Sequence, residues 1–117
     1  MPHVVFDRKL DLVKFQNHFH AIFQKEPVLI KIQNIFLDKF QRTMLLETNV
    51  IDKKNQHFLI EINSKEDKTT LRLYPNTDPE KTNGVKYAMG NVAKQLSEIF
   101  PDAKITQTNI QEFILSK

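Results

Sequence analysis

Apolar and polar residues alternate through the middle of this chain. Side chains of a β-strand point in turn to the two faces of a sheet, so such alternation predicts strands with one buried face. The alternating segments are centred on residues 30–32, 44–46 and 58–62. Polar stretches at 52–55 and 64–68 interrupt them and are typical of turns, and a further strand is expected over 70–74. Strands joined by such short turns predict an antiparallel sheet.

Two other segments have the three-and-four spacing of apolar residues that marks one face of a helix. The first set is Leu12, Phe15, Phe19, Ile22 and Phe23, and the second is Val85, Met89, Val92, Leu96, Ile99 and Phe100. Pro27 and Pro101 end the two patterns, because proline lacks the amide that continues a helix. Asp78 and Pro79 are typical of a helix start. The sequence therefore predicts two amphipathic helices.

Short strands at the two ends complete the expected fold. Residues 4–6 are β-branched and aromatic, and a closing strand is expected over about 104–115. The predicted order is β-α-β-β-β-β-α-β. We expect an α+β fold in which a curved, mainly antiparallel sheet of five or six strands carries two helices on one face. A length of 117 residues suits one domain, spanning 1–117.

The two ends of the chain follow a similar pattern. Each has a strand, a helix ended by proline and a further strand, which begins at Leu29 in one case and Ile105 in the other. A degenerate β-α-β repeat would explain the pattern, as would coincidence; the repeat predicts pseudo-twofold symmetry. The whole plan is similar to one repeat of the TATA-box-binding protein fold. The sequence lacks that family's glycine-rich motif, so DNA binding does not follow from the shared plan.

Composition excludes several classes of site. Two glycines cannot form a glycine-rich phosphate loop, and the absence of cysteine excludes disulfides, thiolate zinc sites and a cysteine nucleophile. Apolar runs are far shorter than the roughly 20 residues of a membrane-spanning helix. The first residues do not have the pattern of a signal peptide. We expect a cytoplasmic protein that does not enter the membrane.

The charge pattern gives little support to a nucleic-acid partner. The formal net charge is only +3, and the lysines are interspersed with acidic residues, whereas nucleic-acid-binding faces concentrate positive charge. Lysines 53, 54, 65 and 68 lie in the two expected hairpin loops, where a soluble sheet commonly carries charge. We therefore do not expect nucleic acid as the main partner.

Other reactive side chains are explained more simply by their place in the fold. His18 and His20 are two residues apart, so on a helix they would point to different faces and would not chelate a metal. Glu47 and Glu61 are expected on the polar side of neighbouring strands. No serine lies in the glycine-flanked turn that a nucleophile needs. We expect no metal and no cofactor.

The start of the chain carries the most specific chemical signal. Initiator methionine is readily removed before proline, and its removal would leave the secondary amine of Pro2 at the head of a strand. An α-amino group ordinarily titrates at about pH 8, and burial in an apolar pocket lowers its pKa. Such an amine can act as a general base that moves a proton between carbon and oxygen. The simpler alternative is that Pro2 is only a terminal proline.

The opening Met1-Pro2-His3, the apolar strand that follows, the β-α-β plan and the closing strand resemble the 5-carboxymethyl-2-hydroxymuconate isomerase branch of the tautomerase superfamily. The resemblance implies a cofactor-free keto-enol tautomerase that forms a trimer, with Pro2 as base and an arginine that binds the substrate carboxylate. Arg42 is the nearest match to the arginine that the family carries after its first helix. Arg72 is the second choice, because it alternates with core-facing leucines.

A binding or assembly module without catalysis is the alternative function. Leu45, Ile51, Leu59 and Tyr74 alternate with the expected core residues, which places apolar side chains on the outer face of the sheet. We therefore expect a homo-oligomer formed through that face. A module would use this face or the lysine-bearing loops, whereas the enzyme requires a free Pro2 amine with a pocket beside it.

Overall fold

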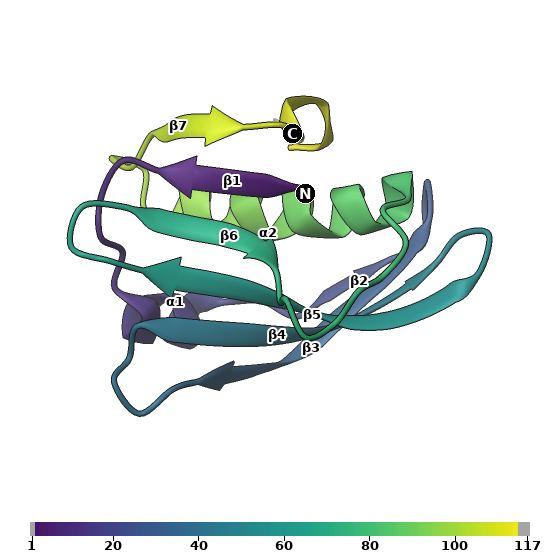
Figure 1. Ribbon diagram of the computed structural model, residues 1–117, viewed down its shortest axis with the longest axis horizontal. Helices are drawn as coiled ribbons and strands as arrows, with labels where there is room; N and C mark the ends of the chain where they lie inside the picture. The colour runs from purple at the N-terminus through teal and green to yellow at the C-terminus, as the bar shows by residue number, and fades with distance from the viewer. Residues whose placement is uncertain (1, 115–117) are drawn as a thin grey trace.

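A seven-stranded antiparallel sheet carries two helices on one face in the computed structural model, which describes residues 2–114 (Figure 1). The strands are β1 (His3–Phe6), β2 (Ile22–Gln24), β3 (Leu29–Leu37), β4 (Thr43–Ile51), β5 (Asn55–Ser64), β6 (Thr69–Leu73) and β7 (Ile105–Thr108). The helices are α1 (Leu12–His18) and α2 (Asn83–Ile99), followed by the short 3₁₀ helix η1 (Gln111–Phe113). The α+β class, the antiparallel sheet and the two helices on one face are confirmed.

The strands are arranged in the order β2-β3-β4-β5-β6-β1-β7. Strands β2 to β6 follow one another as a meander, and β1 is inserted between β6 and β7. Because β1 is antiparallel to both neighbours, β6 and β7 run in the same direction. Helix α2 connects these two strands and crosses behind the sheet (Figure 1).

The core lies between the sheet and the two helices. The alternating apolar residues of β3, β4 and β5 are fully buried, as the sequence predicted. These residues are Ile30, Ile32, Met44, Leu46, Phe58, Ile60 and Ile62. Leu12 and Phe15 of α1, with Val85, Met89 and Val92 of α2, close the core from the helical side. No helix within residues 2–114 has the length and apolarity needed to cross a membrane.

The predicted strand number was wrong because the first helix is shorter than its apolar pattern suggested. Helix α1 ends at His18, and the next residue, Phe19, has extended backbone angles. Residues 22–24 instead form the edge strand β2, in which Ile22 pairs with Ile32 of β3. The spacing of Ile22 fits both a helical face and a strand. The strand is favoured because its backbone groups hydrogen bond to the edge of β3, whose groups need partners.

The second helix begins later than Asp78 and Pro79 predicted. Thr82 is the N-cap, and its Oγ1 accepts a hydrogen bond of 3.3 Å from the amide of Val85. The preceding segment is tied to β5, where the main chain of Glu80 and the side chain of Gln56 exchange two hydrogen bonds of 2.7 and 3.1 Å. These bonds fix the chain before the helix starts.

The closing strand is also shorter than expected. Strand β7 covers only Ile105–Thr108, after which η1 turns back onto α2, where the Phe113 ring meets the Tyr87 ring edge-on. The expected end of this strand at residue 115 lies outside the described residues. The predicted pseudo-repeat does not match the strand order, since three strands separate β1 from β3, which begins at Leu29, and only β1 separates β6 from β7.

Candidate functional site

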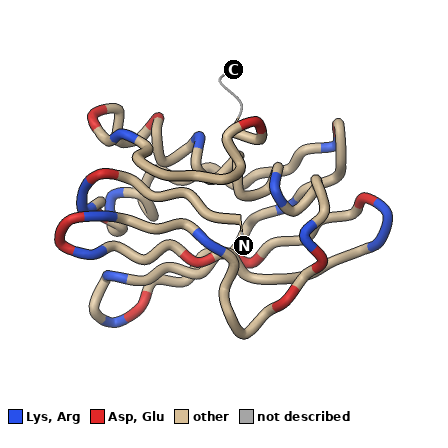
Figure 2. The backbone as a smooth tube through the Cα atoms, turned by 45° about the horizontal axis from the view of Figure 1, so that its top comes forward, with Lys and Arg blue, Asp and Glu red and all other residues tan. Residues whose placement is uncertain are grey.

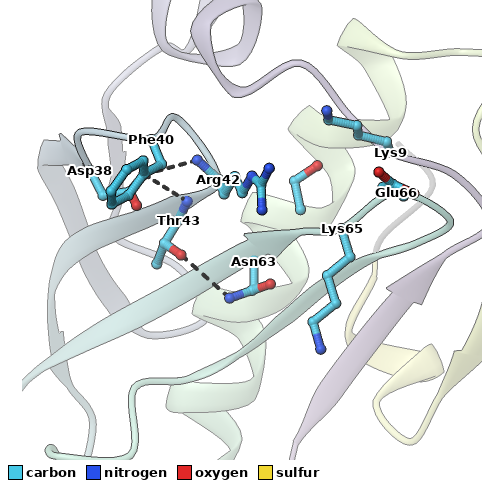
Figure 3. A pocket seen from close by; sticks show the side chains of 9 residues that line it. Lys9, Asp38, Phe40, Arg42, Thr43, Asn63, Lys65 and Glu66 are labelled. Carbon is cyan, nitrogen blue, oxygen red and sulfur yellow. Dashed lines mark hydrogen bonds between the residues drawn. The ribbon is translucent and has the colours of Figure 1, made fainter.

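Three loops meet at one end of the sheet and border a cavity of about 730 Å³. They are residues 7–11 between β1 and α1, residues 38–42 between β3 and β4, and residues 65–68 between β5 and β6. The side chains around the cavity are Lys9, Asp38, Phe40, Arg42, Thr43, Asn63, Ser64, Lys65 and Glu66 (Figure 3). Charged residues gather mainly in the turns at the ends of the sheet (Figure 2).

The turn between β3 and β4 is organised around the Asp38 carboxylate. Its Oδ1 accepts hydrogen bonds from the amides of Arg42, at 2.8 Å, and Thr43, at 3.0 Å. Gln41 takes the left-handed conformation, with φ of 61°, which lets the chain reverse. The Thr43 amide is the main cause of a lowered Asp38 pKa, so the side chain is held in its ionised form. Asp38 thus fixes the backbone that presents Phe40 and Arg42.

Hydrogen bonds tie this turn to the neighbouring hairpin. The amide of Ser64 donates to the main-chain oxygen of Arg42 at 2.7 Å. At the neighbouring pair of residues in this antiparallel ladder, Asn63 Nδ2 donates to Thr43 Oγ1 at 3.3 Å. The main chain of Arg42 is therefore held on its amide side by Asp38 and on its carbonyl side by Ser64.

Two buried hydroxyl groups hold the loop that carries Lys9. Ser64 Oγ donates to the main-chain oxygen of Leu10 at 2.8 Å, and Thr69 Oγ1 donates to that of Arg8 at 3.0 Å. The Leu10 amide lies 3.1 Å from each hydroxyl oxygen. Ser64 and Thr69 are buried, so water does not compete for these bonds. Both neighbours of Lys9 are consequently anchored to the β5–β6 hairpin.

The cavity is bordered by three cations that have no carboxylate partner in the described part of the chain. Within residues 2–114, none of the ion pairs uses Lys9, Arg42 or Lys65. The Arg42 guanidinium and the Lys9 ammonium point from opposite sides toward the space between the loops, whereas Lys65 points away from it (Figure 3). Glu66 lies on the Lys9 side (Figure 3). Since main-chain amides occupy Asp38, Arg42 and Lys9 can attract an anion into the cavity.

The three residues predicted as catalytic lie in three different places. Arg42 borders the cavity described above. Arg72 lies on the outer face of the sheet, where its Nε donates to Glu61 Oε1 at 2.6 Å, and it borders a hollow of about 240 Å³. Pro2 borders a third cavity of about 170 Å³. A single chain therefore does not bring Pro2 together with either arginine.

Pro2 is buried at the start of β1, and two lysines border its cavity. The full set of residues around this cavity is Pro2, Lys81, Lys86, Asn109 and Ile110. Lys81 Nζ also pairs with Asp78 Oδ1 at 2.6 Å. Met1, whose removal would free the Pro2 amine, lies outside the described residues. In one chain, lysine rather than arginine is the cation beside Pro2.

His18 and His20 border the same cavity of about 310 Å³, together with Glu98. The premise that both residues belong to the helix was wrong, because α1 ends at His18, but both side chains are exposed. The main chain of His20 exchanges two hydrogen bonds with the Gln95 side chain, which joins this segment to α2. In the part of the chain that the structure describes, no three metal-ligating side chains are close enough to hold an ion.

The two carboxylates of the outer face have separate partners. Glu47 accepts hydrogen bonds from Asn34 Nδ2 at 2.8 Å and His57 Nε2 at 3.0 Å, and these two contacts, with Asn34 the stronger, lower the Glu47 pKa. Glu61 is paired with Arg72. Each carboxylate is thus explained by a local contact.

Sequence reasoning missed most of this site. Asp38 has a recognisable signal, since aspartate at the start of a short polar interruption between two strands often binds the turn's amides. Lys9 and Phe40 carry no comparable signal, because their approach to Arg42 depends on the packing of three loops that are distant in sequence.

Comparison with known proteins found no relative of this chain. No protein-family model matches it, and no match of significance was found among curated proteins or solved structures.

Proposed function

We propose that this protein is a binding module for a small organic anion, which Arg42 and Lys9 hold in the cavity between the three loops. The observation that carries this proposal is a cavity of about 730 Å³ with two inward-pointing cations that lack carboxylate partners within residues 2–114. Hydrogen bonds from Asp38 and Ser64 hold the main chain of Arg42 in place. A backbone that is already ordered reduces the entropy lost when the ligand binds.

The polar groups around the cavity favour binding over catalysis. A guanidinium matches the two oxygens of a carboxylate or a phosphate, and the Lys9 ammonium adds a second charge. The Ser64 hydroxyl, the one serine side chain at this cavity, already donates to the main-chain oxygen of Leu10. It is therefore not available as a nucleophile without breaking the contact that holds the Lys9 loop.

The proposal is tested by titrating ¹⁵N-labelled protein with glutarate and with inorganic phosphate at constant ionic strength. We expect amide shifts around residues 38–43 and 63–66, and a loss of affinity of about tenfold or more in Arg42→Gln, because charge-assisted hydrogen bonds disappear. Arg8→Gln is the matched control: Arg8 is on the same loop as Lys9 but pairs with Asp7 at 3.0 Å. Equal losses in both variants, or no localised shifts, would refute the proposal.

A second candidate function is tautomerase activity with Pro2 as base, and one observation favours it. Pro2 is buried and borders a cavity with Lys81 and Lys86. Burial and neighbouring cations both disfavour a protonated amine, so they would lower the pKa of a free Pro2 nitrogen toward neutral pH. We propose that a lysine would then hold the substrate carboxylate; Arg42 or Arg72 could do so only from a second copy.

The reaction would return an enol to its ketone without any cofactor. The Pro2 amine would take the hydroxyl proton of the enol and give a proton to the adjacent carbon, so no atom is gained or lost. The test uses enolic phenylpyruvate and protein whose loss of Met1 is verified by intact mass. We expect the rate of ketonisation to fall about 100-fold or more in Pro2→Ala. Lys94→Gln, on α2 but away from this cavity, should retain activity. Turnover that survives in Pro2→Ala would exclude this mechanism.

We also propose that the protein forms a homo-oligomer through the outer face of its sheet. Leu45, Leu59 and Tyr74 are half-buried there, and Ile51 is 43% exposed. Apolar side chains on the uncovered face of a sheet favour association. Sedimentation equilibrium should show the oligomer dissociating in Leu45→Lys but not in Val13→Lys, on α1; a monomeric unmodified protein would refute this.

We propose a cytoplasmic location, since the chain has no cysteine and thus no disulfide that would require an oxidising compartment. Fractionation of the source cells, with detection of the untagged protein, tests this directly. Recovery from a secreted or envelope fraction would contradict it.

A further inference from the structure

The ring of Phe40 is the most exposed large apolar side chain in the described part of the protein. It is 74% exposed, compared with 61% for Phe23 and 56% for Phe36. Phe40 lies in the turn between β3 and β4 and borders the same cavity as Arg42. A large aromatic ring that is exposed to water at the border of a cavity is poorly explained by stability, because it contributes little to the core.

The main chain under this ring is held in place. The amides of Arg42 and Thr43 donate to the Asp38 carboxylate, and the Gln41 amide donates to the main-chain oxygen of Asp38 at 3.1 Å. The ring is therefore presented from a fixed turn rather than from a loose loop. A ligand that covers it would bury apolar surface without first having to order the backbone.

We infer that the anion bound in this cavity carries a flat aromatic ring: its acid group meets Arg42, and its ring packs against Phe40. The inference rests on the anion-binding function proposed above and adds the class of ligand. Phe40 and Arg42 are two residues apart in one turn, so a single small molecule can reach both. Packing between aromatic rings supplies affinity beyond the area that is buried. The acid group can be a carboxylate or a phosphate.

Matched probes separate the contribution of the ring from that of the charge. We would measure the affinities of acetate, cyclohexylacetate and phenylacetate, and of inorganic phosphate and phenyl phosphate, from amide shifts at constant ionic strength. We expect each phenyl compound to bind about three- to tenfold more tightly than its partner without a ring. Cyclohexylacetate should fall between acetate and phenylacetate, because it buries area without an aromatic face. The stronger of the two phenyl compounds identifies the acid group.

Variants of Phe40 and Phe36 provide the second test. Phe40→Leu should abolish the preference for phenylacetate over cyclohexylacetate while leaving acetate binding unchanged. Phe36→Leu removes an exposed ring that does not border the cavity. It should change neither the preference for phenylacetate nor the affinity for acetate. Both positions are exposed, so both variants should fold, and their circular dichroism spectra check this.

The outcomes distinguish this inference from the function on which it rests. If acetate and phenylacetate bind equally and both are weakened in Arg42→Gln, the cavity binds anions but the aromatic class is wrong. If no probe binds at Arg42, the proposed function itself fails, and the inference fails with it. If Phe40→Leu changes the mass of the oligomer in solution and leaves the probe affinities unchanged, Phe40 contacts another protein chain, and the inference is overturned.

Discussion

Gly90 lies directly beneath the main-chain carbonyl of Phe113, and a Cβ atom at this position would be 1.8 Å from the carbonyl oxygen. Helix α2 thus leaves an open surface on which the segment after β7 packs. The Phe113 ring meets the Tyr87 ring edge-on at a centroid distance of 4.8 Å, and the Lys86 ammonium lies 5.7 Å from its centroid. These contacts hold the C-terminal segment beside the Pro2 cavity, which Lys86 also borders.

Gly90→Ala should displace the C-terminal segment from α2. The added methyl group meets main-chain atoms, which cannot move aside alone, so η1 must shift as a unit and Phe113 must lose burial. We expect a net loss of about 1–3 kcal/mol in the free energy of unfolding, despite the better helix propensity of alanine. Urea unfolding measures the loss, and Tyr87 fluorescence reports the separation of the two rings.

Gly84→Ala is the control for this prediction. A Cβ atom on Gly84 would meet Asp52 Oδ2 at 2.6 Å and Val50 Cγ1 at 2.7 Å, which are side-chain rather than main-chain atoms. Its effect should therefore be smaller than that of Gly90→Ala. Equal stability of Gly90→Ala and the unmodified protein would show that the C-terminal segment is not packed on α2.

Ser64→Ala should weaken both the fold and the proposed anion site. The substitution leaves the buried carbonyl of Leu10 without its hydroxyl donor, and an unsatisfied buried polar group costs about 1–3 kcal/mol. The loop carrying Lys9 then loses one of its two anchors, so glutarate affinity should also fall. Urea unfolding and amide-shift titration measure the two effects.

Ser97→Ala, at a half-buried position of α2 that does not border the cavity, controls for loss of a serine. We expect little change in stability and none in glutarate affinity. If Ser64→Ala and Ser97→Ala behave alike, the buried hydroxyl does not anchor the Lys9 loop.

The period of the apolar residues predicted most of the sheet. Residues Ile30, Met44 and Ile60 were placed in the core from alternation alone, and the structure buries them fully. Arg72 was expected on the outer face because it alternates with Leu71 and Leu73, and it lies there with both leucines buried. These predictions succeed because successive side chains of a strand point to opposite faces of the sheet. A two-residue period of apolar positions therefore shows directly which face is buried.

The ends of the helices and strands, and the residues that form the candidate site, depend on contacts between distant residues. No local pattern of apolar residues reveals these contacts. Ile22 satisfies a helical spacing, yet it pairs with Ile32 at a sheet edge. The hydrogen bond between Ser64 and Leu10 joins positions 54 residues apart, and without it the sequence gives no reason to place Lys9 near Arg42. Pairings of this kind are decided by tertiary packing, which outweighs local propensity.

Arg72→Leu should destabilise the protein because it leaves a carboxylate unpaired. The Glu61 side chain is only 8% exposed and accepts from Arg72 Nε at 2.6 Å. Since Arg72 itself is 45% exposed, water can partly replace it, and we expect a loss of about 1–3 kcal/mol, below the full penalty for a buried pair. Urea unfolding at neutral pH measures the loss.

Replacing both residues of this pair should restore stability. The double variant Glu61→Leu, Arg72→Leu removes the unpaired charge, and apolar replacements of such pairs are often neutral or stabilising. Arg8→Leu is the control, because its pair with Asp7 is exposed and should contribute little. Arg72→Leu with no greater loss than Arg8→Leu would mean that the Glu61 carboxylate is adequately hydrated without its partner.

Asp38→Ala should remove an acid-sensitive part of the stability. The turn's amides lower the Asp38 pKa below its ordinary value of 3.8, with the Thr43 amide the main cause. A carboxyl group with a lowered pKa in the folded state contributes stability that is complete above 3.8 and disappears as the pH falls through the folded value. Asp38→Ala should therefore be less stable than the unmodified protein at pH 7. The difference should vanish once the pH is below the pKa of Asp38 in the folded protein.

The difference between the two proteins isolates Asp38 from other groups that titrate in the same range. Asp7, Asp52 and Asp78 also have lowered pKa values, so the unmodified protein loses stability in acid for several reasons at once. Urea unfolding of both proteins across the acid range gives the difference, and ¹³C NMR titration of the Asp38 carboxyl gives its pKa directly. Asp38→Asn, which keeps an acceptor oxygen without the charge, should be intermediate at neutral pH. A stability difference that does not change with pH would mean that Asp38 acts through packing, and the turn would then present Arg42 and Phe40 without an ionised carboxylate.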